Sequence, residues 1–141
     1  MRIETSIDID APPERVWAVM ADVEHWHEWT ASIRDIRFET PPPLRAGSKL
    51  RIRQPKLPAA VWTVTRVDPG QGFDWRSRGP GLSAFASHNI EALDGNRSRV
   101  TLIIEQTGLF AGLIGALIEG RSRRYVEMEA NGLKARSESG R

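Results

Sequence analysis

The chain has 141 residues, of which 40% are hydrophobic and 27% are charged. This length and composition are typical of one globular domain with a sizeable core, here residues 1–141, and they exclude disordered and fibrous proteins. Twenty basic against 18 acidic residues give a net charge of +2 that is scattered along the chain, which argues against a nucleic-acid partner.

The chain contains no cysteine, which excludes a disulfide framework, thiolate chemistry and cysteine-based metal sites. Its first ten residues, MRIETSIDID, are charged and strand-like and do not resemble a signal peptide. The longest apolar run, residues 109–118, is about half as long as a membrane span. We therefore expect a cytoplasmic protein without stable membrane insertion.

The first 30 residues predict one strand and two short helices. Isoleucines alternate with polar residues from Arg2 to Asp10, which is the pattern of a half-buried strand. Pro13 suits the first turn of a helix whose apolar side chains extend to Met20. A second short helix is expected over residues 23–29.

The middle of the chain predicts six short strands separated by proline, glycine and asparagine turns. Because the links are short, consecutive strands must pair antiparallel. The expected strands are residues 33–39, 49–54, 60–67, 72–78, 82–93 and 99–106.

The chain ends in a long amphipathic helix, predicted from Phe110 to about Lys134. At 1.5 Å per residue this helix is roughly 35–40 Å long and must lie against the preceding sheet. The sequence thus predicts an α+β fold.

Strand alternation predicts which residues face this helix. The apolar set of the last two strands is Leu82, Ala84, Ala86, His88 and Ile90, then Val100, Leu102, Ile104 and Gln106. Trp62 and Trp75 are expected to point the same way from the middle strands. The small side chains at Ala84 and Ala86 either let the helix approach closely or leave room for a ligand.

Several motifs occur in the order typical of one superfamily. The first helix begins Pro-Pro-Glu-Arg-Val-Trp at residue 12, and a Val-Asp-Pro-Gly hairpin starts at residue 67. His88 lies in a late strand, and the last helix contains Tyr-Val-Glu-Met-Glu-Ala-Asn-Gly-Leu from residue 125. With Trp26 and Trp29 these motifs resemble the SRPBCC superfamily (START-like, polyketide cyclase/dehydrase) over essentially the whole chain.

That resemblance implies a helix-grip fold, in which a curved sheet grips the long helix around a deep apolar cavity. Its members hold lipids, sterols, polyketides or hormones in this cavity, or use it for a cyclase-type reaction. We expect the ligand-binding residues to be Trp29, Trp62, Trp75, Ala86, His88, Leu102, Gln106, Leu117, Arg121 and Tyr125. Each tryptophan is also compatible with a core role, since the wall of a pocket is itself part of the core.

The candidate polar residues have two interpretations each. His88 falls among apolar residues, so it is either a neutral, hydrogen-bonded core imidazole or a catalytic acid–base group. Arg121 lies inside the apolar stripe of the helix, where it either extends to the rim of the domain or meets a ligand at the cavity mouth. His25 and His27 diverge on a helix, so we expect no metal and no cofactor.

The sequence leaves three functions open. The first is binding of a small hydrophobic molecule, such as a lipid, a polyketide or an aromatic compound, beneath the last helix. The second is a polyketide cyclase or dehydratase that works without metal and uses His88 to carry protons. The third is a protein-interaction module, and homodimerisation through an edge strand also stays open.

Overall fold

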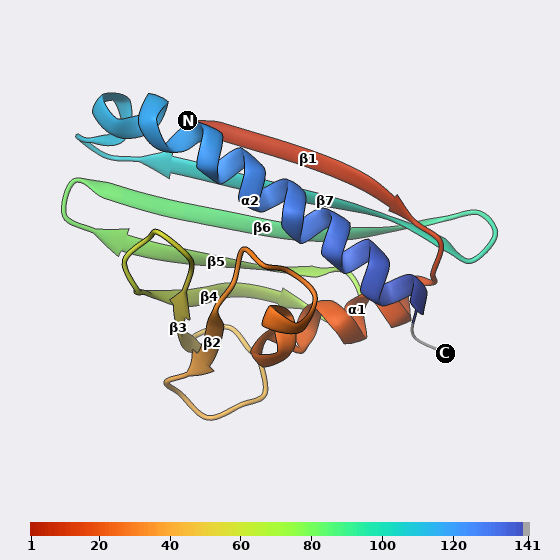
Figure 1. The fold of residues 1–141 in the computed structure, drawn as a ribbon. Helices are drawn as coiled ribbons and strands as arrows, with labels where there is room; N and C mark the ends of the chain where they lie inside the picture. The colour runs from red at the N-terminus through yellow and green to blue at the C-terminus, as the bar shows by residue number, and fades with distance from the viewer. Residues whose placement is uncertain (140–141) are drawn as a thin grey trace.

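The computed structural model describes residues 1–139, apart from the side chains of residues 113–117. One antiparallel sheet and a long C-terminal helix make up most of the protein (Figure 1). The strands are β1 (Arg2–Ile9), β2 (Asp35–Phe38), β3 (Lys49–Arg53), β4 (Ala60–Asp68), β5 (Gly72–Gly79), β6 (Leu82–Leu93) and β7 (Arg97–Thr107). The helical elements are α1 (Pro13–Ala21), η1 (Val23–Glu28) and α2 (Ala111–Ser139).

The seven strands form one sheet in the order β1-β7-β6-β5-β4-β3-β2. Strands β2 to β7 follow one another as hairpins, while β1 pairs with β7. The segment α1–η1 therefore connects the two edge strands of the sheet, β1 and β2. The predicted α+β helix-grip architecture is confirmed.

Several element boundaries differ from the sequence prediction by one to five residues. The second helix is a 3₁₀ helix that ends at Glu28, and α2 continues five residues beyond Lys134 to Ser139. Strand β2 begins only at Asp35, because the backbone around Ser32 and Ile33 is still in a turn, in which Ile33 N–H donates to Thr30. Apolar pattern alone could not locate these ends.

The main core lies between the sheet, α1, η1 and the C-terminal half of α2. The pattern that places it is the alternation of apolar residues along the strands together with one apolar face on each helix. Its largest fully buried side chains include Val16, Met20, Trp26, Leu50, Phe73 and Leu133.

Polar contacts fasten the C-terminal end of α2. The Arg15 guanidinium on α1 donates to the carbonyls of Arg136 and Ser137, at 3.1 and 3.3 Å, which occupies two of the acceptors that a helix end leaves free. Lys134 Nζ donates to the carbonyl of Asp8 on β1 at 3.0 Å. This end of α2 is thus fixed to both β1 and α1.

A glycine lets α2 approach the chain just after η1. A Cβ atom at Gly132 would lie 2.0 Å from the Trp29 carbonyl oxygen and 2.9 Å from its ring. Only a residue without a side chain fits this crossing. The close approach sets how α2 lies over the inner face of the sheet, by which we mean the face toward α2.

Candidate functional site

Several of the predicted site residues come together on the inner face. Cross-strand pairing puts Trp75 of β5 beside Ala86 of β6, and Phe73 beside His88. His88 is paired in turn with Leu102 of β7. Trp75, Ala86, His88 and Leu102 therefore form one continuous patch on three neighbouring strands.

This patch is covered unevenly. His88 and Leu102 are each 3% exposed, whereas Ala84, Ala86 and Gln106 are only half-buried. The half-buried residues lie nearer the start of α2, since Ala84 pairs with Gln106 at the end of the sheet where β7 leads into that helix. The inner-face residues are thus fully buried around His88 and half-buried toward the end of β7.

Gln106 carries an unsatisfied polar atom. Its Oε1 is buried and has no hydrogen-bond partner among the described residues. Buried amide oxygens are nearly always paired, because leaving one unpaired costs about 1–3 kcal/mol. Gln106 therefore offers an acceptor that a ligand's hydroxyl or amide group would satisfy.

Aromatic rings surround His88. The imidazole stacks on Phe73 with ring centroids 4.3 Å apart, and Trp26 and Trp75 meet it edge-on at 5.6 and 5.5 Å. The Trp26 indole N–H is satisfied by the carbonyl of Met20 at 3.0 Å. This cage keeps water from the His88 ring and fixes its orientation.

The hydrogen bonding of His88 determines its tautomer. Nδ1 lies 3.1 Å from the Phe73 carbonyl oxygen, which can only accept, so Nδ1 carries the hydrogen. Nε2 is then left with a free lone pair, and Oε2 of Glu129 on α2 lies 3.5 Å from it. His88 and Glu129 form a pair between the sheet and α2.

Burial keeps both members of this pair uncharged near neutral pH. Removal from water lowers the pKa of His88 to about 4, because a buried imidazolium loses its hydration. The same cause raises the pKa of Glu129 to about 8. At pH 7 the pair is a neutral imidazole, which can accept a proton, beside a carboxylic acid, which can donate one.

Glu129 is the site residue that the sequence analysis missed. It lies four residues after Tyr125 and four before Leu133, and therefore on the helix face that packs inward. Its carboxylate falls inside the apolar stripe of the helix, and this position in the sequence could have identified it as a candidate site residue. It was hidden in the motif Glu127-Met128-Glu129, in which Glu127 is exposed.

The remaining predicted residues lie around this centre. Trp29 and Trp62 are half-buried, with ring centroids 5.3 Å from Trp26 and 5.9 Å from Trp75, respectively. The predicted Leu117 lies outside the residues whose side chains are described. Trp29 and Trp62 therefore extend the aromatic cluster outward from His88.

Arg121 and Tyr125 contact the segment between β3 and β4. The Tyr125 hydroxyl donates to the Pro55 carbonyl, and Arg121 Nη1 donates to the Lys56 carbonyl at 3.4 Å. Both side chains thus tie α2 to a loop near the edge of the sheet that is farthest from β1. For Arg121 this is the rim position that one of the two sequence interpretations described.

Within the described residues, no three potential metal-ligating side chains come close together. None of the helices in that part of the chain is long and apolar enough to cross a membrane.

A family model described as "Polyketide cyclase / dehydrase and lipid transport" matches residues 1–138 of the chain. The chain belongs to this family. The sequence resemblance to the SRPBCC superfamily is therefore confirmed across nearly the whole length.

Solved structures with this fold include proteins of different kinds. The ZhuI aromatase/cyclase from Streptomyces sp. R1128 superposes with a TM-score of 0.79 and 18% identity, covering 98% of this chain and 93% of that one. A START superfamily protein from Mycobacterium smegmatis superposes with a TM-score of 0.77 and 14% identity, covering 98% and 97%. At these identities the likeness concerns the fold alone.

A curated relative is Toxin Rv0910 from Mycobacterium tuberculosis, which is 26% identical over 83 residues. The match covers 57% of this chain and 58% of that protein, so it spans little more than half of either.

Proposed function

We propose that this protein binds a small hydrophobic molecule between the inner face of the sheet and α2. The uneven coverage of the inner face carries the proposal. Aromatic walls at Trp62 and Trp75 border small side chains at Ala84 and Ala86, which are half-buried. Apolar walls with a few polar groups are typical of small-molecule sites.

The polar groups at this place favour an uncharged ligand with a hydrogen-bonding end. His88 and Glu129 are both neutral near pH 7, so neither would neutralise a charged group. Oε1 of Gln106, which has no partner in the described part of the chain, would accept a hydrogen bond from a ligand donor. A lipid, polyketide or phenolic compound with a hydroxyl group meets both requirements, and membership of the lipid transport and cyclase family supports that class.

Ligand binding can be tested by replacing a small residue of the sheet with a large one that occupies the proposed site. The Ala86→Phe variant places a ring where the small side chain leaves room, and we expect it to abolish retention of a hydroxylated fatty acid or a naphthol. Native mass spectrometry and quenching of tryptophan fluorescence measure retention, since four of the five tryptophans lie in the aromatic cluster.

A matched control separates loss of the site from loss of the fold. Ala92 lies on the same strand but is exposed, so Ala92→Phe should bind both probes as the unmodified protein does. Equal retention by the two variants, with unchanged circular dichroism, would place the ligand elsewhere or show that there is none.

The pair of His88 and Glu129 also favours a second candidate, a cyclase acting on a poly-carbonyl chain. In an intramolecular aldol condensation, a proton leaves the carbon between two carbonyls and that carbon attacks a further carbonyl, whose oxygen takes up a proton. Nε2 of His88 would accept the first proton, and the carboxylic acid of Glu129 would supply the second. Positioning of the poly-carbonyl substrate in a site that excludes water would provide most of the rate enhancement.

This alternative makes a kinetic prediction that simple binding does not. With a polyketide surrogate, the rate should fall when Glu129 loses its proton above pH 8. Glu129→Gln and His88→Gln should each slow the reaction by about a hundredfold or more, a typical contribution of acid–base catalysis. If both variants keep the full rate, the pair has no catalytic role and binding alone remains.

A further inference from the structure

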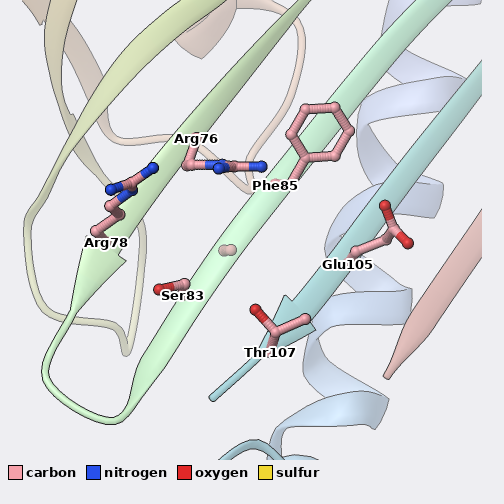
Figure 2. A pocket seen from close by; sticks show the side chains of 7 residues that line it. Arg76, Arg78, Ser83, Phe85, Glu105 and Thr107 are labelled. Atoms are coloured by element: carbon pink, nitrogen blue, oxygen red, sulfur yellow. The ribbon is translucent and has the colours of Figure 1, made fainter.

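An open groove lies on the outer face of the sheet, the face away from α2 (Figure 2). Its volume is about 460 Å³, and its lining side chains come from three neighbouring strands, β5, β6 and β7. They alternate along the strands with Trp75, Ala86 and Ile104, which face inward, so the sheet separates this groove from the site under α2. The lining residues whose side chains face outward are Arg76, Arg78, Ser83, Phe85, Glu105 and Thr107, while Ala84 lines the groove from between Ser83 and Phe85 and its side chain alternates to the inner face.

Two arginines in the groove differ from the others on the central strands. Arg66 on β4 has a carboxylate 2.9 Å away, and Arg99 on β7 has one at 2.8 Å. Arg76 and Arg78 have no carboxylate within 4 Å among the described residues. They are two residues apart on the same face of β5, with Cα atoms roughly 6.6 Å apart. Two neighbouring guanidinium groups that no described carboxylate approaches within 4 Å attract an anion.

The strand register aligns further donors with these arginines. Arg78, Ser83 and Thr107 are directly paired across β5, β6 and β7, so one guanidinium and two hydroxyls form a row. Neither hydroxyl has a hydrogen-bond partner in the described part of the chain. Such a row matches the three terminal oxygens of a phosphate group, because guanidinium and hydroxyl groups donate to phosphate with favourable geometry.

The neighbouring row of paired residues, Arg76, Phe85 and Glu105, adds an aromatic surface and ends at an acidic side chain. The Arg76 guanidinium lies over the Phe85 ring, 5.6 Å from its centroid, which holds it above the groove. Phe85 is paired with Glu105, whose carboxylate lies 4.0 Å from Arg2 on β1. The Phe85 ring, which is half-buried, gives an organic group attached to the phosphate an apolar surface to contact.

We propose that this outer groove binds a small phosphomonoester that carries a ring. The two arginines neutralise the phosphate dianion, the hydroxyls of Ser83 and Thr107 complete its hydrogen bonds, and the ring packs beside Phe85. This second site is independent of the ligand proposed under α2.

An NMR titration at low ionic strength tests the proposal with three probes, namely phenyl phosphate, inorganic phosphate and benzoate. Phenyl phosphate should bind most tightly and shift the signals of Arg78, Ser83 and Phe85. Arg78→Gln should weaken this binding at least about tenfold, the loss expected for one charge-assisted contact. Phe85→Leu should abolish the preference for phenyl phosphate over inorganic phosphate.

Arg37→Gln is the matched control, because Arg37 is an exposed arginine on β2 at the far edge of the same face. It should leave binding unchanged. Equal weakening by Arg37→Gln and Arg78→Gln would mean non-specific attraction to the positive surface and overturn the proposal. Tighter binding of benzoate than of phenyl phosphate, or an absence of shifts at the groove, would overturn it as well.

Discussion

At the scale of single residues, the main feature is a buried neutral base, His88, beside a half-buried neutral acid, Glu129. Glu129 is held uncharged by burial, which opposes the ordinary preference of a carboxyl group to ionise at neutral pH. Nothing charged lies close enough to it in the described residues to offset that effect, since its near neighbour His88 is itself deprotonated. Such an arrangement reduces stability and is typical of sites that bind or react.

The pair makes a prediction about the pH dependence of folding stability. Because the pKa of Glu129 rises from 4.5 to about 8 on folding, the native state binds more protons than the unfolded state between these values, and stability falls as the pH rises through this window. Glu129→Gln removes this loss. At pH 8 the variant should be more stable than the unmodified protein by up to about 4 kcal/mol. Urea unfolding at pH 5 and pH 8 measures the difference.

His88 produces the opposite slope and supplies the control. Its pKa falls from 6.5 to about 4 on folding, so the unfolded state binds more protons and stability is lost as the pH falls through that range. His88→Gln should therefore remove the loss on acidification and leave the loss between pH 6.5 and 8 in place. If Glu129→Gln changed stability equally at pH 5 and pH 8, Glu129 would be ionised in the folded protein.

At the scale of elements, the position of α2 depends on two sets of contacts, one with the chain after η1 and one with the β3–β4 loop. Gly132 sets its closest approach to the chain after η1, while Tyr125 and Arg121 tie it to the loop between β3 and β4. Figure 1 shows α2 running diagonally over the sheet with α1 near its C-terminal end. These contacts hold the helix over His88 and Ala86.

Gly132→Ala should destabilise the protein although alanine is the better helix former. The added Cβ would meet the Trp29 carbonyl at 2.0 Å, and relieving this clash should cost about 1–3 kcal/mol. Gly120→Ala, on the same helix with nothing within 4 Å, should instead stabilise by up to about 1 kcal/mol. Thermal unfolding compares the two. Stabilisation by both changes would show that α2 does not pass so close to Trp29.

Tyr125→Phe should loosen the link between α2 and the β3–β4 loop. The hydroxyl donates to the Pro55 carbonyl, and losing this bond should cost about 0.5–1.5 kcal/mol. We expect faster hydrogen exchange at the amide of Leu57, which donates to Gln54 in the same loop, and unchanged exchange in β1. Unchanged exchange at Leu57 would contradict a role of Tyr125 in holding the loop.

At the scale of the whole molecule, the fold could be predicted from the sequence because patterns that extend over many residues determine it. Strand alternation, turn residues and the apolar face of the last helix predicted the element order and the inner-face residues of β6 and β7. Contacts between segments that are distant in the sequence could not be predicted from it. The pairing of Glu129 with His88 joins residues 41 positions apart, and the clash that requires Gly132 involves Trp29, 103 positions away. Only the folded chain brings these groups together.

The outer groove shows a second limit of pattern reading. The alternation that predicts Ala84 and Gln106 on the inner face implies the outer face for Ser83 and Glu105, but only the register of three strands shows that Phe85 and the two arginines of β5 lie beside them. Register sets which residues of neighbouring strands lie side by side, and it depends on turn geometry as well as on the hydrophobic pattern, so the pattern of one strand alone does not determine it.

The central claim is that a small hydrophobic molecule binds between the sheet and α2. A crystal structure of the protein purified from its host cells, without added ligand, tests this most directly. We expect elongated non-protein electron density in contact with Ala84, Ala86 and Gln106, with a polar end near Oε1 of Gln106. Protein side chains filling that space completely, with no density from another molecule, would contradict the account.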